Sequence, residues 1–77
     1  MAYNKDKVDE MTLALLYLVM EKSKESTRAW KGFDWDTMNR LHEKGYIGDP
    51  KSKAKSVALS EEGARLAEEL FKMNFSA

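Results

Sequence analysis

Three lysines at alternate positions, Lys51, Lys53 and Lys55, are the most distinctive chemical feature of this sequence. They lie in the segment GYIGDPKSKAKSVALSEEG, residues 45–63. An ammonium group binds a phosphate as a point charge, so a row of lysines suits contact with a nucleic-acid backbone. The alternative is that the lysines protect the exposed edge of a strand from pairing with other chains. The residues support these two interpretations equally. A third interpretation is that the lysines contact the acidic surface of a protein partner.

Asn39 and Arg40 are the side chains best suited to reading bases. Asparagine pairs with adenine and arginine with guanine in the major groove, and both residues fall in the helical segment DWDTMNRLHEKG. Asp36 and Glu43 flank them, and Asp36 stands four residues before Arg40, where we expect an ion pair. The outward face of this helix is therefore close to neutral, which argues against a strong DNA reader.

The segment RAWKGFDW is dense in aromatic residues. We expect these rings to fill the core, with Trp35 buried in one stripe with Met38 and Leu41. The alternative leaves Trp30 partly exposed, so that Trp30 and Phe33 form a protein-interaction patch beside Arg28 and Lys31. Tryptophan and arginine are enriched in interface hot spots, and tryptophan also stacks on bases of single strands.

Composition argues against catalysis. The 77 residues include no cysteine, and His42 is the one histidine, so neither a disulfide nor a metal site is expected. The chain has no glycine-rich phosphate loop, and no nucleophile has a base at useful spacing. We therefore predict that the protein is not an enzyme and takes no cofactor. A polar N-terminal segment and the lack of a long apolar run predict a cytoplasmic protein without a membrane span.

The net charge is zero, but it is unevenly distributed. Residues 22–55 carry nine lysines and arginines against five acids, whereas residues 1–21 and 56–77 each carry two against four. The basic middle favours an anionic partner, although the isoelectric point of about 6.6 is below that of most nucleic-acid modules.

The spacing of apolar residues predicts the elements that position these side chains. We expect one domain, residues 1–77, that begins with a helix over Lys5–Lys22 capped by Asn4. Ser26 or Thr27 caps a short helix, or the segment is a turn; Asp34 caps the next helix, and Gly45 ends it. A two-stranded hairpin turns at Asp49-Pro50-Lys51-Ser52, and its return strand runs over Lys55–Leu59. Lys53 and Lys55 have the same parity as Val57 and Leu59, so they extend that face if the pairing runs out that far. Ser60 caps the last helix, where Phe71 joins the core; Met73 and Phe75 either join it or pair two subunits.

Two segments carry a resemblance to winged-helix domains: LHEKGYI, which ends a helix, and VALSEEG, which follows the hairpin. The pattern is similar to that of small bacterial winged-helix regulators, and the chain also resembles a group of small uncharacterised bacterial proteins. The resemblance implies a mainly α fold with a β-hairpin (α+β), in the order helix, short helix, helix, hairpin wing, helix. It further implies that the helix from Asp34 to Lys44 lies in the major groove while the hairpin contacts the DNA backbone.

Two hypotheses follow. In the first, the chain is a winged-helix regulator that binds duplex DNA as a dimer, with bases contacted by Asn39 and Arg40 and phosphates by Lys51, Lys53 and Lys55. Arg28 and Lys31 then flank the groove. In the second, the chain is a protein-interaction module that uses the RAWKGF surface, including Trp30 and Phe33, without binding DNA.

Overall fold

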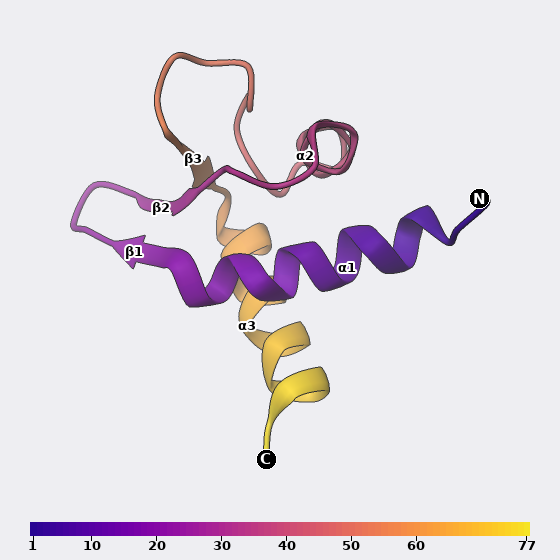
Figure 1. Ribbon diagram of the computed structural model, residues 1–77. Coiled ribbons are helices and arrows are strands. Elements are labelled where there is room, and N and C mark those ends of the chain that lie inside the picture. The colour runs from indigo at the N-terminus through magenta and orange to yellow at the C-terminus, as the bar shows by residue number, and fades with distance from the viewer.

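The computed structural model describes residues 1–77 and has mixed α+β architecture, as expected. Its elements in chain order are α1 (Lys5–Leu16), a 3₁₀ turn η1 (Tyr17–Val19), β1 (Met20–Lys22), β2 (Thr27–Trp30), α2 (Trp35–Glu43), β3 (Ser56–Leu59) and α3 (Glu61–Phe75). Figure 1 shows α1 running across the molecule, with α3 crossing it and extending below, while α2, β2 and β3 lie above α1 and β1 continues from its end. This helix-plus-hairpin arrangement is consistent with the expected class.

The three strands form one antiparallel sheet in the order β1-β2-β3. Alternate residues of a strand point to opposite faces, and the register places Met20, Ala29 and Val57 side by side on the inner face. Ala29 and Val57 are buried in the core. The outer face carries the intervening residues, among them Arg28 opposite both Glu21 and Ala58. The sheet therefore has one packed face and one open face.

The first helix is shorter than its apolar pattern predicts. Asn4 caps it by accepting a hydrogen bond from the backbone N–H of Lys7, as expected. The α-helix ends at Leu16, the chain tightens into the 3₁₀ turn, and residues 20–22 become β1 instead of the last turn of the helix. Met20 is a partly buried neighbour of the core. The apolar residues after Leu16 thus serve the turn and the sheet, which helical spacing alone does not reveal.

The expected short helix within residues 22–33 is absent, because these residues form the β1–β2 hairpin. Ser26 does not cap a helix; its backbone N–H bonds Ser23 Oγ, and its carbonyl accepts from both the N–H and the hydroxyl of Ser23. Thr27 and Trp30 bound β2, and both residue types favour strands. Consequently α2 is preceded by a strand, not by a second helix packed against it.

Helix α2 has the caps that its sequence predicts. Asp34 Oδ2 accepts hydrogen bonds from both the backbone N–H and the hydroxyl of Thr37, and Gly45 follows the helix in the left-handed conformation with φ of 83°. The expected burial of Trp35 is wrong, because 60% of its surface is exposed. The buried residues are Thr37, Met38 and Leu41, so the buried face is centred away from the first residue of the helix.

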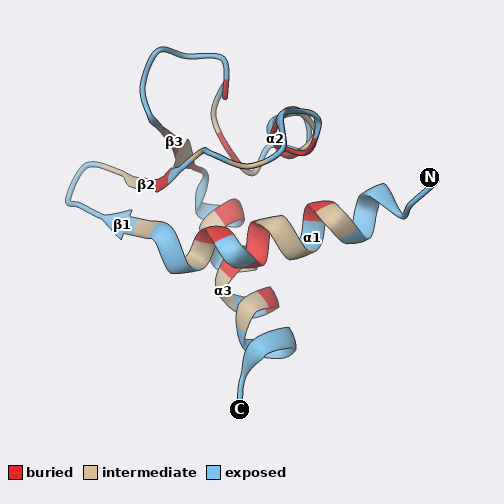
Figure 2. Ribbon diagram, viewed as in Figure 1, coloured by how far each residue is buried: buried red, intermediate tan, exposed pale blue.

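The core gathers where α1, α2, α3 and the inner face of the sheet meet (Figure 2). Ser60 caps α3 by accepting from the Gly63 N–H at 3.0 Å, and its hydroxyl donates to the Gly45 carbonyl at 2.8 Å. Gly63 lies directly against the Tyr46 carbonyl, where a methyl group would clash. The Ser-x-x-Gly pattern therefore joins the start of α3 to the end of α2. Phe71 packs on this core as expected, whereas Met73 and Phe75 are exposed.

Candidate functional site

The cations of α2 are bonded within the molecule. Arg40 Nε donates to both carboxylate oxygens of Asp9, at 2.8 and 3.0 Å, and Lys44 Nζ donates to Asp9 at 2.8 Å and to Asp6 at 3.2 Å. Asp9 belongs to α1, and only 1% of its surface is exposed. The expected ion pair between Asp36 and Arg40 does not form. Arg40 therefore joins α2 to α1, a role that spacing along one helix could not reveal.

The ion pairs shift the pKa values of all three groups. Burial acts to raise the pKa of Asp9, but hydrogen bonds from Arg40 and Lys44 outweigh it and hold the pKa below its usual value. The hydrogen bond to Asp9 raises the pKa of Arg40 and likewise that of Lys44, against the opposing effect of burial. Each group thus favours its charged form, and the cluster is a fixed structural link.

Asn39, the other predicted base reader, is half-buried. It lines a polar hollow of about 290 Å³ together with Lys51, His42, Glu43 and Asp49. His42 Nδ1 lies 3.0 Å from the Ile47 carbonyl oxygen, which ties this histidine to the chain after α2. The structure therefore brings Asn39 close to the basic loop, but with two carboxylates beside them.

Lys51, Lys53 and Lys55 lie in the irregular loop of residues 48–55, not in a strand, so the expected strand parity with Val57 does not hold. All three are exposed, and none forms an ion pair. The Asp49 side chain accepts from the Lys51 N–H at 2.9 Å, as the turn chemistry predicts.

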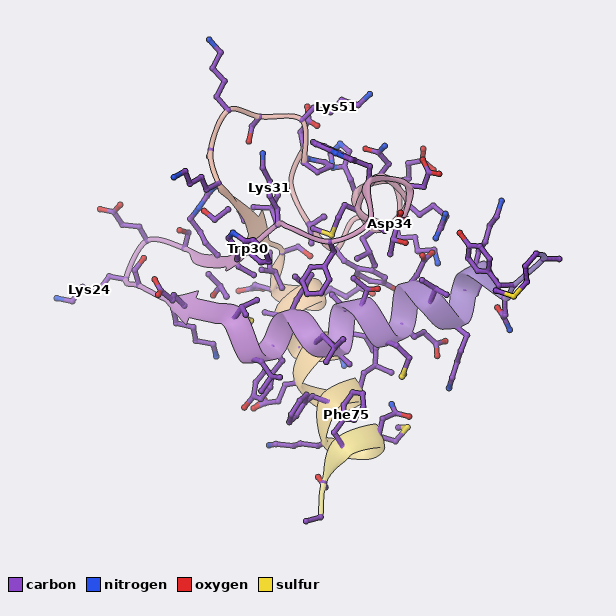
Figure 3. The ribbon with its side chains drawn as sticks, in the orientation of Figure 1. Lys24, Trp30, Lys31, Asp34, Lys51 and Phe75 are labelled. Carbon is purple, nitrogen blue, oxygen red and sulfur yellow. The ribbon has the colours of Figure 1, made fainter.

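Lys31 holds this loop in place. Its ammonium group donates to the carbonyl oxygens of Pro50, at 2.8 Å, and Ser52. Figure 3 shows the Lys31 side chain extending from the chain beside Trp30 toward the loop that carries Lys51. Lys31 is consequently a support for the loop, and two of its three N–H donors are already used.

Trp30 lies on the outer face of the sheet beside a shallow hollow of about 240 Å³. Val19, Glu21, Arg28, Ala29, Trp30, Lys55 and Ser56 line this hollow. The Trp30 ring rests over Gly32, where any side-chain carbon would clash with it, and its centroid is 6.3 Å from that of Phe33 in an edge-to-face arrangement. Even so, 56% of Trp30 is exposed. The ring is positioned by its neighbours and still accessible.

Arg28 is half-buried in the floor of this hollow. Its Nε donates to Ser56 Oγ at 2.7 Å, and its Nη2 donates to the Ser56 carbonyl at 2.8 Å. These bonds join β2 to β3 on the open face. The sequence places Arg28 near Trp30 but does not reveal Ser56, which the pairing of β2 with β3 brings beside it, or Val19, which the turn η1 places there.

No group of three or more metal-binding side chains lies close enough together to hold an ion. None of the helices combines the length and the apolar character that crossing a bilayer requires.

Known proteins place the chain in a family without assigning it an activity. It is 49% identical over 76 residues to the uncharacterised protein y4hR of Sinorhizobium fredii (strain NBRC 101917 / NGR234), covering 99% of each chain. No solved structure matches it, so the winged-helix resemblance has no support from a known fold. Residues 4–77 match the family model described as a domain of unknown function, DUF6429, and the chain belongs to this family of small, uncharacterised proteins.

Proposed function

We propose that this chain is a non-catalytic protein-interaction module that binds its partner through the Trp30 surface. We define this surface as Val19, Arg28, Trp30, Phe33 and Lys55. The observation that carries the proposal is the exposure of Trp30, 56% of whose surface is free although Gly32 and Phe33 fix its position. A pre-positioned aromatic ring contributes a large contact area at low entropic cost, which is typical of interface hot spots.

The use of the cations elsewhere also favours a protein partner over base reading. Arg40 and Lys44 bond Asp9, and Lys31 bonds the loop carbonyls, so three cations of the basic middle region are already engaged. Releasing Arg40 to reach a base would leave a buried carboxylate with one fewer partner, which costs free energy. Helix α2 is therefore better suited to supporting the fold than to reading DNA.

Affinity capture with matched tryptophan variants tests the proposal. Wild-type protein, Trp30→Ala and Trp35→Ala serve as baits, because both rings are largely exposed but only Trp30 lines the hollow. A partner captured by wild type and Trp35→Ala should be lost with Trp30→Ala, and calorimetry with the purified partner should repeat the difference. Equal binding by Trp30→Ala, with its amide spectrum showing an intact fold, removes this surface from the proposal.

A second candidate function is contact with duplex-DNA phosphates through the loop of residues 48–55, in a regulatory role. The observation that favours it is specific: Lys51, Lys53 and Lys55 are exposed, unpaired and carried by a loop that Lys31 fastens to the sheet. Phosphate contact needs point charges and no base readout, so the engagement of Arg40 does not count against it. Such binding would be insensitive to sequence unless Asn39, beside Lys51, reaches a base.

A further inference from the structure

We infer that the partner of the Trp30 surface presents a carboxylate next to a bulky apolar side chain. This inference rests on the proposed protein-interaction function and adds the chemistry of the partner. It depends on three features of the hollow beside Trp30: the orientation of Arg28, the balance of charge on the rim, and the apolar wall.

The Arg28 guanidinium is held in place by Ser56 and keeps free N–H donors that can bind an anion. An arginine has five N–H donors, and the bonds from Nε and Nη2 to Ser56 use two of them. Nη1 has no partner within the molecule. Because the bonds to Ser56 already hold the guanidinium in place, binding a carboxylate would cost Arg28 less side-chain entropy than it would cost a free arginine.

The charges around the hollow are not balanced. Arg28 and Lys55 line it together with one acid, Glu21. Glu21 lies directly opposite Arg28 in the register of β1 and β2, yet the two form no ion pair, and Arg28 bonds β3 instead. A surplus of one positive charge therefore remains beside Trp30, and a single carboxylate from the partner would neutralise it.

The apolar wall of the hollow is the reason for the bulky apolar side chain expected in the partner. Val19 and Trp30 both line the hollow, and both are partly exposed. The volume of about 240 Å³ is below the range of about 300–1,000 Å³ usual for small-molecule sites, and it suits a single side chain of a larger partner. An aliphatic side chain next to the carboxylate would cover Val19 and the open part of the Trp30 ring.

A single-stranded nucleic acid fits the same hollow less well. Such chains bind along a continuous track of cations with bases stacked on aromatic rings. Glu21 would interrupt such a track of cations at the hollow, and Phe33 already packs against the Trp30 ring in an edge-to-face pair. One carboxylate can turn toward Arg28 and away from Glu21, which a chain of phosphates cannot do.

Selection from a random peptide library tests the inference. Displayed eight-residue peptides are selected on immobilised wild-type protein and counter-selected on Trp30→Ala, with Trp35→Ala as the control that should keep binding. We expect enrichment of peptides with aspartate or glutamate next to leucine, isoleucine or valine. In an NMR titration, the best peptide should shift the Trp30 indole N–H and the Arg28 Nε–H signals.

Matched variants then isolate the carboxylate. Replacing the acid of the peptide by its amide, or Arg28 by glutamine, should each weaken binding about tenfold, because a charge-assisted hydrogen bond is lost. Arg65→Gln is the control, since Arg65 lies on α3, where it bonds Glu69. The double change, amide peptide with Arg28→Gln, should cost little more than either change alone.

The outcomes separate the inference from the function on which it rests. Selected peptides that need Trp30 but carry no acid, or that bind Arg28→Gln equally well, overturn the inference and leave the interaction function standing. A library that yields no peptide able to distinguish wild type from Trp30→Ala contradicts both. An oligothymidine strand that shifts Trp30 and Arg28 while the selected peptides do not also overturns both and assigns the surface to nucleic acid.

Discussion

Asp9 of α1 binds Arg40 of α2 through both of its carboxylate oxygens, and the same carboxylate accepts from Lys44 one turn further along α2. One nearly inaccessible acid thus neutralises two cations on the helix that would face DNA in a winged-helix protein. The pairing stabilises the packing of α2 on α1, and it removes from the surface the side chain best suited to reading guanine.

We expect Asp9→Asn to destabilise the protein by about 1–3 kcal/mol, because the amide cannot satisfy both cations and its N–H₂ group points donors at donors. Urea unfolding of the two proteins measures the difference. Glu10→Gln is the matched control, since Glu10 is the next residue, is exposed and forms no ion pair. A loss no larger for Asp9→Asn than for this control would show that the cluster contributes little.

The same carboxylate should make stability depend on pH. The folded pKa of Asp9 is lowered from its usual 3.8, so the unfolded chain takes up the proton first as the pH falls. The stabilisation is therefore fully present above about pH 5, and protonation removes it as the pH falls below 3.8 toward the folded pKa. Unfolding of wild type and Asp9→Asn should differ at neutral pH and converge in acid. A difference that is constant from pH 7 down to acid would contradict this assignment.

Gly63→Ala should destabilise the protein although alanine favours helices. The gain in helix propensity is at most about 1 kcal/mol, whereas the new methyl group would meet the backbone carbonyl of Tyr46, which cannot move without shifting Ile47 in the core. We expect a net loss of about 1–3 kcal/mol in thermal or urea unfolding. Gly32→Ala is the comparison: its methyl group meets side-chain atoms of the partly exposed Trp30 and no backbone atoms, so its cost to stability should be smaller.

If the basic loop contacts DNA, the salt dependence should report the number of phosphates neutralised. Replacing Lys51, Lys53 and Lys55 by alanine should reduce the slope of log K against log salt by about 2.7 for duplex DNA. A control that replaces Lys5, Lys7 and Lys72 changes the net charge equally, but it does so away from the loop. Fluorescence anisotropy at several salt concentrations measures both. An unchanged slope in the loop variant would show that these lysines do not contact phosphates.

The local signals of the sequence were the most reliable. Asn4, Asp34 and Ser60 cap their helices as predicted, and Gly45 adopts the left-handed conformation. Each of these depends on a hydrogen bond or backbone preference within four residues, so the chemistry is visible in the sequence itself.

Features set by distant residues could not be predicted in the same way. The sequence predicts a short helix or a turn where β2 forms, because the stabilising partner of Thr27 is Leu59, which lies far along the chain. Arg40 has Asp36 at helical spacing, but it bonds Asp9 on another helix. Of the candidate site, the exposure of Trp30 was one of two alternatives, while Ser56 as the support of Arg28 depends on the sheet register.

The insertion of α2 between β2 and β3 has a consequence for the order of folding. Strands β1 and β2 pair residues about five to nine positions apart, whereas β2 and β3 pair residues about 26 to 32 apart. Each doubling of a closed loop adds about 0.6 kcal/mol of entropic cost, so the β1–β2 hairpin is favoured to form first. The contact between Arg28 and Ser56 then belongs to the late stages of folding. Ser56→Ala should accordingly speed unfolding more than it slows refolding.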